Sequence, residues 1–560
     1  QSQTEPKRTM TTRLFVACLL PVLVWTGCRR EDSTEAARRA ITPELLAEHI
    51  QVLASDEFLG RAPASPGEEK TVNYLIEQFQ ALGLRPGNGD SYTQEVPLAE
   101  ITADPASARL EVQGRRGRLR FRYGDEAMFW TKRLVPEVSV TGSEVVFVGY
   151  GIVAPEYDWN DYAGVDVRGK TVVMLVNDPG YATGDSTLFT GRAMTYYGRW
   201  TYKFEEAARQ GAAAALIIHE TGPAGYPWAV VQGSWSGPQF TLVNEQQNMD
   251  RCAIEGWLTY ESARRLFELA GRDLEQLKAA AVRPGFRAVP LGLRLSAALR
   301  NTIREVRSRN VLALLPGRER PDEVVIYTAH WDHLGVDPSL PGDSIYNGAL
   351  DNATGTAGLL ALARAFTALP EPPARSVLFL AVTAEEQGLL GSAYYATHPV
   401  FPPEKTVAVL NMDGLNVLGP MRDVTVIGYG MSELDDYAAA AAEAQGRYLR
   451  PDPEPEKGYY YRSDHFSFAR VGIPALYLDA GIDHVEHGPD WTLARRAEYV
   501  ERHYHKPSDE YDPAWDLRGA VDDLRLLFDI GYRLANSTDF PNWREGTPFR
   551  ALREQQRAGS

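Results

Sequence analysis

Residues 324–332 (VVIYTAHWD) decide the fold, because a continuous apolar and β-branched run ends there on a histidine and an aspartate. A short run of this kind is typical of a strand buried on both faces of a parallel sheet. The alternation of such runs with helical patterns at 354–369 and 432–445 predicts an α/β fold: a doubly wound, mostly parallel central sheet with helices on both faces. The further runs are 310–317 (NVLALLPG), 376–386 (SVLFLAVTAEE), 406–414 (TVAVLNMDG) and 473–481 (IPALYLDAG).

Side chains that can bind a metal stand at the ends of these strands and in the loops that follow them. Ligands of open α/β sheets collect outside the carboxyl ends of the strands. Zinc accepts imidazole nitrogen and carboxylate oxygen, and a pair of zinc ions joined by a bridging carboxylate can activate water and polarise a carbonyl group. The sequence therefore predicts a metal-dependent hydrolytic site at this edge. The residues are His330, Asp332, Asp351, Glu385, Glu386 and Asp413.

Asp332 lies two residues after His330. A carboxylate at that position is suited to accept the second imidazole N–H, which fixes the tautomer and the orientation of a histidine ligand. We therefore expect Asp332 to support the site without binding the metal.

The charge balance limits the classes of partner. The chain of 560 residues has 58 basic and 74 acidic side chains, and its net charge of −16 disfavours nucleic acid and anionic membrane surfaces. Its length predicts a main domain with an inserted or appended one. Two of its three cysteines, Cys18 and Cys28, lie in the N-terminal segment, so the remainder has no disulfide framework.

The N-terminal segment has the pattern of an export signal. Basic Lys7, Arg8 and Arg13 precede an apolar run at 14–25 that is too short to span a membrane comfortably, and Cys28 follows. The small residues Thr26 and Gly27 just before Cys28 resemble a lipobox, which implies an exported periplasmic or cell-envelope protein, with Cys28 as a lipid anchor. Trp25 stands where a lipobox has leucine, so cleavage by an ordinary signal peptidase stays an alternative.

A second unit interrupts the main one. Residues 149–175 (GYGIVAPEYDWNDYAGVDVRGKTVVML) and 203–220 (KFEEAARQGAAAALIIHE) resemble the protease-associated domain, a β-rich module inserted in several peptidases. We expect the following organisation: a signal segment at 1–28, a tether at 29–41, a peptidase domain at 42–134 and 291–540, the protease-associated domain at 135–290, and a C-terminal tail at 541–560.

Five motifs in order carry a second resemblance. AHWDHLG at 329–335, GALDNATGTAGLL at 348–360, AEEQGLLGS at 384–392, NMDG at 411–414 and YHKPSDEYD at 504–512 resemble the clan MH co-catalytic zinc aminopeptidases, which are relatives of glutamate carboxypeptidase. The likeness covers about residues 44–130 and 300–535.

The resemblance implies a ligand set for two zinc ions per chain. Asp351 would bridge the ions, with His330 and Asp413 on one ion and Glu386 and His505 on the other. It also implies that Glu385 is the general base and that the Tyr504 phenol hydrogen-bonds the oxyanion.

The expected function is hydrolysis of peptide bonds, with release of N-terminal residues from peptide substrates by water held between the zinc ions. A glutamate-carboxypeptidase-like exopeptidase is an alternative within the same chemistry. A non-catalytic receptor or binding protein on a peptidase scaffold is an alternative from another class, which the intact ligand set and Glu385 disfavour. We expect Asp464 and His465 to be structural or to position substrate, and His484 and His487 to lie in a rim loop.

Overall fold

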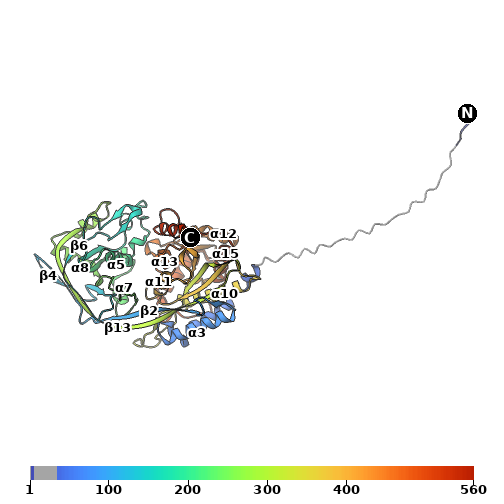
Figure 1. The fold of residues 1–560 in the computed structure, drawn as a ribbon, viewed down its shortest axis with the longest axis horizontal. Helices are drawn as coiled ribbons and strands as arrows, with labels where there is room; N and C mark the ends of the chain where they lie inside the picture. Colours follow the sequence, from blue (N-terminus) through green and yellow to red (C-terminus); the bar gives the residue numbers. More distant parts are fainter. Residues whose placement is uncertain (1, 5–33, 560) are drawn as a thin grey trace.

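The computed structural model describes residues 2–4 and 34–559, and it consists of two units that lie side by side (Figure 1). Apart from residues 2–4, the predicted signal segment and Cys28 lie outside the described residues. Within the described ranges, no helix combines the length and apolar character needed to cross a membrane.

The larger unit is built on a mixed, mostly parallel sheet. The strand β14 (Arg320–His330) lies at its centre and pairs in parallel with β17 (Arg375–Val382) and β18 (Thr406–Asn411). The sheet continues through β21 (Ala475–Asp479), β19 (Asp423–Ile427) and β20 (Tyr448–Pro451), of which only the β19–β21 pair is antiparallel. Beyond β17 lies β13 (Val289–Leu315), which is antiparallel to it.

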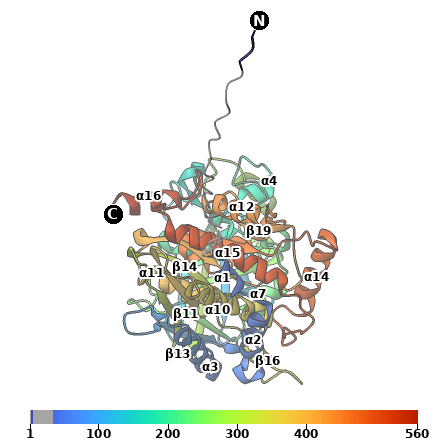
Figure 2. The same ribbon diagram turned by 90° about the vertical axis from the view of Figure 1, so that its right-hand side faces the viewer.

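Helices cover both faces of this sheet (Figure 2), which confirms the predicted fold class. Alternate residues of β14 point to opposite faces, as the geometry of a strand requires. Val325 and Tyr327 join the core under α10 (Thr354–Thr367) and α15 (Arg518–Asn536). Val324 and Ile326 join a second core with residues from α11 (Leu390–Thr397) and α13 (His465–Arg470). Other helices of this unit are α2 (Pro43–Leu53), α3 (Pro66–Ala81), α12 (Leu434–Ala444) and α14 (Gly488–Arg502).

The smaller unit begins earlier than the predicted boundary at residue 135. The strand β3 (Arg109–Gly114) pairs with the first part of β13, and β5 (Ala127–Trp130) pairs with β12 (Ile254–Thr259). Leu110 and Val112 of β3 are buried in the core of the smaller unit, so this segment belongs there and not to the peptidase domain. The other main elements are β4 (Gly117–Arg120), β6 (Glu137–Phe147), β9 (Thr171–Leu175), β10 (Ala214–His219), α5 (Trp200–Arg209), α7 (Trp228–Ser234), α8 (Tyr260–Leu269) and α9 (Leu274–Ala281).

A two-stranded ribbon joins the units and runs across both of them in Figure 1. It consists of β2 (Thr93–Ala103) and the second half of β13, which pair without interruption from Thr93 opposite Val311 to Ala103 opposite Asn301. On its other edge β2 pairs with β11 (Pro238–Leu242), a strand from the smaller unit's part of the chain.

The predicted tether and the predicted C-terminal tail both pack against the larger unit over the described residues. The predicted tether at 29–41 includes α1 (Glu35–Arg39), and the side chains of Ala37 and Ile41 are fully buried in the main core. The predicted C-terminal tail contains α16 (Arg550–Ala558) and the fully buried Trp543. Apolar burial therefore attaches both segments to the larger unit.

Candidate metal centre

The predicted ligands meet at the carboxyl edge of the central sheet. His330 is the last residue of β14, Asp413 follows β18, and Glu386 follows β17. Asp351 lies in the turn Ala349–Ala353 that leads into α10. His505 arrives from the loop after α14 with a backbone φ of +55°, a conformation that non-glycine residues rarely adopt.

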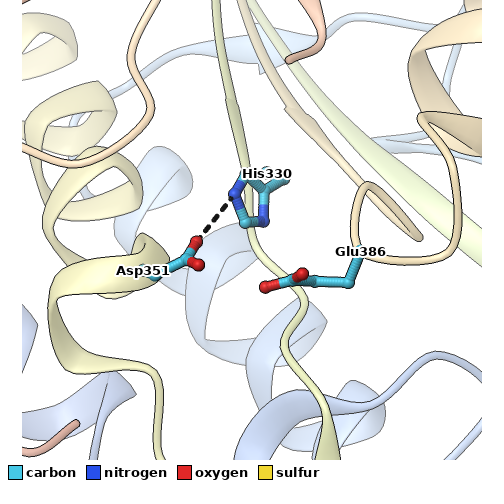
Figure 3. A group of neighbouring side chains, drawn as sticks. All are labelled: His330, Asp351 and Glu386. Carbon is cyan, nitrogen blue, oxygen red and sulfur yellow. Dashed lines mark ion pairs between the residues drawn. The ribbon is translucent and has the colours of Figure 1, made fainter. Parts of the chain in front are cut away.

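One group of donors surrounds His330. Its Nε2 atom lies 3.4 Å from Oδ1 of Asp351 and 3.3 Å from Oδ1 of Asp413. Figure 3 shows the Asp351 carboxylate turned toward the His330 ring, with Glu386 directed into the same region from the opposite side. The imidazole is almost fully buried, with 1% of its surface exposed.

A second group surrounds His505, and Asp351 is common to both groups. Nε2 of His505 lies 3.2 Å from Oδ2 of Asp351 and 3.1 Å from Oε2 of Glu386. The two oxygens of Asp351 thus face different histidines, which is the geometry expected of a bridging carboxylate.

These distances fit metal ions better than they fit pairing between side chains. Four ligands at 2.0–2.1 Å around a tetrahedral ion lie about 3.3 Å from one another, close to the four separations observed. Nε2 of His505 is buried and makes no hydrogen bond, although two carboxylate oxygens lie beside it. A buried imidazole nitrogen that makes no hydrogen bond beside two carboxylates indicates a cation site, since leaving it unpaired would be costly.

The electrostatics also indicate a cation. Burial lowers the pKa of His330, whereas the carboxylates of Glu385 and Asp413 raise it. The carboxylates have the larger effect, so the pKa of His330 lies well above its ordinary value. Burial raises the pKa of Asp332 to about 8 and that of Asp464 to about 7. So many carboxyl groups in one buried place require positive charge to ionise together.

Glu385 and Glu386 leave β17 in different directions. Ala384 has a φ of +53°, so the chain turns sharply just before them. Oε2 of Glu385 lies 3.9 Å from Nε2 of His330, whereas Glu386 faces His505. Burial raises the pKa of Glu385 well above its ordinary value, a property suited to a general base.

Asp332 does not have the predicted hydrogen bond to His330. Its nearest carboxylate oxygen is 3.7 Å from Nδ1 of His330, which lies 3.1 Å from the backbone oxygen of Asp332 instead. Oδ1 of Asp332 accepts a hydrogen bond from the backbone N–H of Glu385 at 3.1 Å. The aspartate therefore joins the His330 loop to the loop of the predicted base, because β14 and β17 end side by side.

Several supporting residues were not predicted from the sequence. Asp509 accepts hydrogen bonds from the backbone of Leu350 and Asp351 at 3.0 and 3.1 Å. His333 Nδ1 lies 2.6 Å from Oε1 of Glu386. His333 lies in the same motif as His330, and Asp509 lies in the same motif as His505. This closeness in sequence to predicted ligands is what could have identified them as supporting residues.

Arg61 was also missed. Its guanidinium is buried and donates to the backbone oxygens of Trp331, Asn347 and Gly348 at 2.9, 2.6 and 2.9 Å. It also donates to the backbone oxygen of Leu53 at 2.7 Å. One side chain therefore connects α2 to the two loops that carry His330 and Asp351.

The other predicted site residues lie close to the centre or apart from it. The Tyr504 ring stacks on His505 with centroids 3.8 Å apart, and its role at the oxyanion stays a prediction. Asp464 is buried close enough to His330 to share its electrostatic field. His484 accepts backbone hydrogen bonds from Glu486 and His487 through Nδ1, and the structure does not bring it to the ligand groups.

The chain is similar to known peptidases. Residues 310–528 match the profile of Peptidase family M28. Aminopeptidase NAALADL1 of Mus musculus is 33% identical over 138 residues, which cover 23% of this chain and 17% of the mouse protein. Aminopeptidase YwaD of Bacillus subtilis is 26% identical over 217 residues, which cover 37% of this chain and 40% of that protein. The chain thus spans less than half the length of these curated relatives.

The fold as a whole has a solved counterpart. The aminopeptidase from Aneurinibacillus sp. strain AM-1 aligns with 90% of this chain and 97% of its own, at 20% identity and a TM-score of 0.50. That likeness concerns the fold alone. The residues 310–528 that match Peptidase family M28 contain all five predicted ligands and Glu385, so the similarity covers the whole candidate metal centre.

Proposed function

We propose that this protein is an exported di-zinc metallopeptidase that releases N-terminal residues from peptides. The observation that carries the proposal is the sharing of Asp351 between two donor groups, each with its own histidine and a second carboxylate. The names of the relatives support an aminopeptidase. Export is supported by the pattern of basic residues, apolar run and Cys28 in the sequence.

His330 and Asp413 would hold one zinc ion, Glu386 and His505 the other, and Asp351 both. Zinc at these donors would supply Lewis acidity for the scissile carbonyl and for the attacking water. The chain's own contributions follow from the geometry: Glu385 stands beside the His330 group, takes a proton from the water at its carboxylate, and delivers it to the leaving amine. Tyr504, stacked on His505, offers a phenol O–H to the developing oxyanion.

The test is activity of the zinc-loaded protein on aminoacyl substrates with free or acetylated N-termini, together with N-blocked peptides ending in glutamate. We expect cleavage only next to a free N-terminus, and about two zinc ions per chain. Glu385→Gln should lower kcat by roughly 10²–10⁴-fold, the usual contribution of general base catalysis, while zinc content stays the same. Glu510→Gln, which changes an exposed glutamate five residues after His505, is the matched control.

Two outcomes would contradict the proposal in different ways. Cleavage of the N-blocked glutamyl peptides alone would assign carboxypeptidase polarity. Full turnover by Glu385→Gln would remove this residue as the base.

A further inference from the structure

The loop that brings His505 to the candidate metal centre runs from the end of α14 to Asp509. His505 has a backbone φ of +55°, which is unfavourable for a residue with a Cβ atom. Residues in such conformations persist only where the surrounding structure determines them. The contacts of this loop must therefore hold His505 in place.

One hydrogen bond closes the loop across its base. The phenol O–H of Tyr499, in the last turn of α14, donates to Oδ2 of Asp509 at 3.1 Å. His505 lies between these two residues in the chain. The bonds of Ser508 to Arg502 and His503 also span the loop, but they are exposed to competing water. The part-buried bond of Tyr499 is therefore the better shielded of the two connections.

Asp509 extends this connection to the predicted bridging ligand. It is 2% exposed, and its Oδ1 accepts a hydrogen bond from the backbone N–H of Leu350 at 3.0 Å. Its Oδ2, the atom that Tyr499 binds, also accepts from the backbone N–H of Asp351 at 3.1 Å. The Asp509 backbone oxygen accepts from the N–H of Ala349 at 3.0 Å. One carboxylate oxygen thus joins the Tyr499 phenol to the turn that carries Asp351.

The two residues connected in this way belong to the same predicted ion. Nε2 of His505 lies 3.2 Å from Oδ2 of Asp351, within the second donor group. Tyr499 is linked to His505 through the closed loop and to Asp351 through Asp509. In the other donor group, the Asp413 carboxylate is oriented by the hydroxyl of Ser463 instead. The Tyr499 bond therefore concerns one ion more than the other.

The helix that carries Tyr499 has little apolar attachment of its own. Figure 2 shows α14 at the margin of the larger unit, and Thr492 is the one buried residue among its positions 488–502. Its side-chain contacts are the Trp491 ring against two histidines, Arg496 to the backbone oxygen after β21, and Tyr499 to Asp509. Elements with few buried apolar contacts open at a low cost in free energy. Tyr499 is the contact of this set nearest to His505 in the chain.

We propose that Tyr499 is a positioning residue for one of the two zinc ions, and that its phenol holds the His505 loop on Asp509 so that His505 and Asp351 face the same ion. The inference rests on the proposed di-zinc centre and names a residue on which the second ion depends. Without the hydroxyl, Oδ2 of Asp509 keeps the Asp351 N–H alone, and the loop loses the bond across its base.

Tyr499→Phe tests this, because it removes the hydroxyl and keeps the ring. Titration of the metal-free protein in a zinc buffer measures the dissociation constants of the two ions. The constant of the His505 ion should rise about 10–100-fold, the usual effect of losing an interaction that orients a ligand, and the other should stay unchanged. His505→Ala, which removes the ligand itself, identifies which constant belongs to this ion.

Tyr437→Phe is the matched control. Its phenol donates to Oδ2 of Asp539 at 2.8 Å on the exposed side of α12, and its loss should leave both zinc constants as in the wild type. Asp509→Asn tests the connection from the other end. Tyr499→Phe should add little to the effect of Asp509→Asn, since the phenol acts through that carboxylate. Full additivity of the two substitutions would overturn the proposed connection.

Hydrogen exchange separates this inference from the proposed function, because it requires neither zinc nor turnover. In metal-free Tyr499→Phe protein, the amides of residues 349–351 and 503–509 should exchange faster than in the wild type and in Tyr437→Phe. Faster exchange there, with weaker binding of one ion, would support the role of Tyr499 even if no peptide were cleaved.

Two results would overturn the inference and leave the peptidase proposal standing. One is exchange and zinc binding that Tyr499→Phe does not alter. The other is an equal weakening of both ions together with a lower midpoint of thermal unfolding, which would assign Tyr499 a general structural role. A wild-type protein that bound no zinc would contradict the di-zinc proposal, and the exchange result would then decide on Tyr499.

Discussion

The hydroxyl of Ser463 donates a hydrogen bond of 2.6 Å to Oδ2 of Asp413, while Oδ1 of the same carboxylate faces His330. Hydrogen bonds of this kind orient a metal ligand, and their loss typically costs 10–100-fold in metal affinity. We therefore expect Ser463→Ala to weaken zinc binding by about one order of magnitude or more. Competition with a chelator measures the zinc affinity of both proteins. Ser376→Ala, which removes a buried serine hydroxyl bonded to the Pro321 carbonyl, should leave zinc affinity unaltered.

Arg61 is expected to affect both stability and zinc binding. Arg61→Met removes four hydrogen bonds to backbone oxygens in a buried place and should lower the free energy of unfolding by about 3–5 kcal/mol. It should also weaken zinc binding, because the His330 and Asp351 loops lose their common partner. Denaturant unfolding and chelator competition measure the two effects.

Arg553→Met provides the comparison for Arg61. This buried arginine donates to the oxygens of Pro403 and Thr406, at the other end of the central sheet. The Arg553→Met substitution should lower the free energy of unfolding and leave zinc affinity unchanged. Equal losses of zinc affinity in both variants would show that Arg61 acts through general stability alone.

Asp435 predicts a pH dependence of stability. Burial raises its pKa from 3.8 to about 6, against the opposing hydrogen bond from the Gly430 N–H. The folded state therefore binds more protons than the unfolded state between pH 4 and 6. The stabilisation from this group is complete below that window and is lost as the pH rises through it. Asp435→Asn should reduce the fall in stability between pH 4 and 7 by on the order of 2–3 kcal/mol.

Thermal unfolding at several pH values measures that difference. Asp436→Asn changes a neighbouring aspartate on α12 that is exposed and paired with Arg544, and it should not alter the pH profile in this way. A profile for Asp435→Asn that runs parallel to the wild type would contradict the prediction.

Trp543 is expected to anchor the C-terminal segment. Its side chain is fully buried, and its indole N–H donates to the oxygen of Gly472 at 2.9 Å. Trp543→Ala should lower the free energy of unfolding by about 3–5 kcal/mol, the usual cost of emptying a buried aromatic site. Leu552→Ala, at an exposed position of α16, should change it by less than about 0.5 kcal/mol.

The fold class and most of the metal centre could be predicted because their signals are local. Buried parallel strands are apolar throughout, and His330, Glu386 and Asp413 stand at their ends. His505 could be placed only through resemblance, since it lies in a loop that no periodicity connects to the sheet. Arg61 was beyond reach because its contact with Gly348 joins residues 287 positions apart.

The predicted boundary between the two units at residue 135 was wrong for a related reason. Both units contain alternating strands, so nothing in the local pattern of residues 109–130 shows which sheet they join. The C-terminal segment lacked an apolar periodicity, and a single tryptophan in a polar stretch gives no sign of where it packs. Its attachment depends on a cavity formed by distant parts of the chain.

The ribbon of β2 and β13 limits how the protein could be shortened. Ala103 lies opposite Asn301, so a two-residue Asn-Gly turn could replace residues 104–300 and close a regular hairpin. Such a shortened chain would also lose β11, whose Phe240 and Leu242 pack against Val96 and Leu98. One long edge of β2 would then be bare, with unpaired N–H and C=O groups beside apolar side chains, and the shortened protein would be prone to aggregate through that edge.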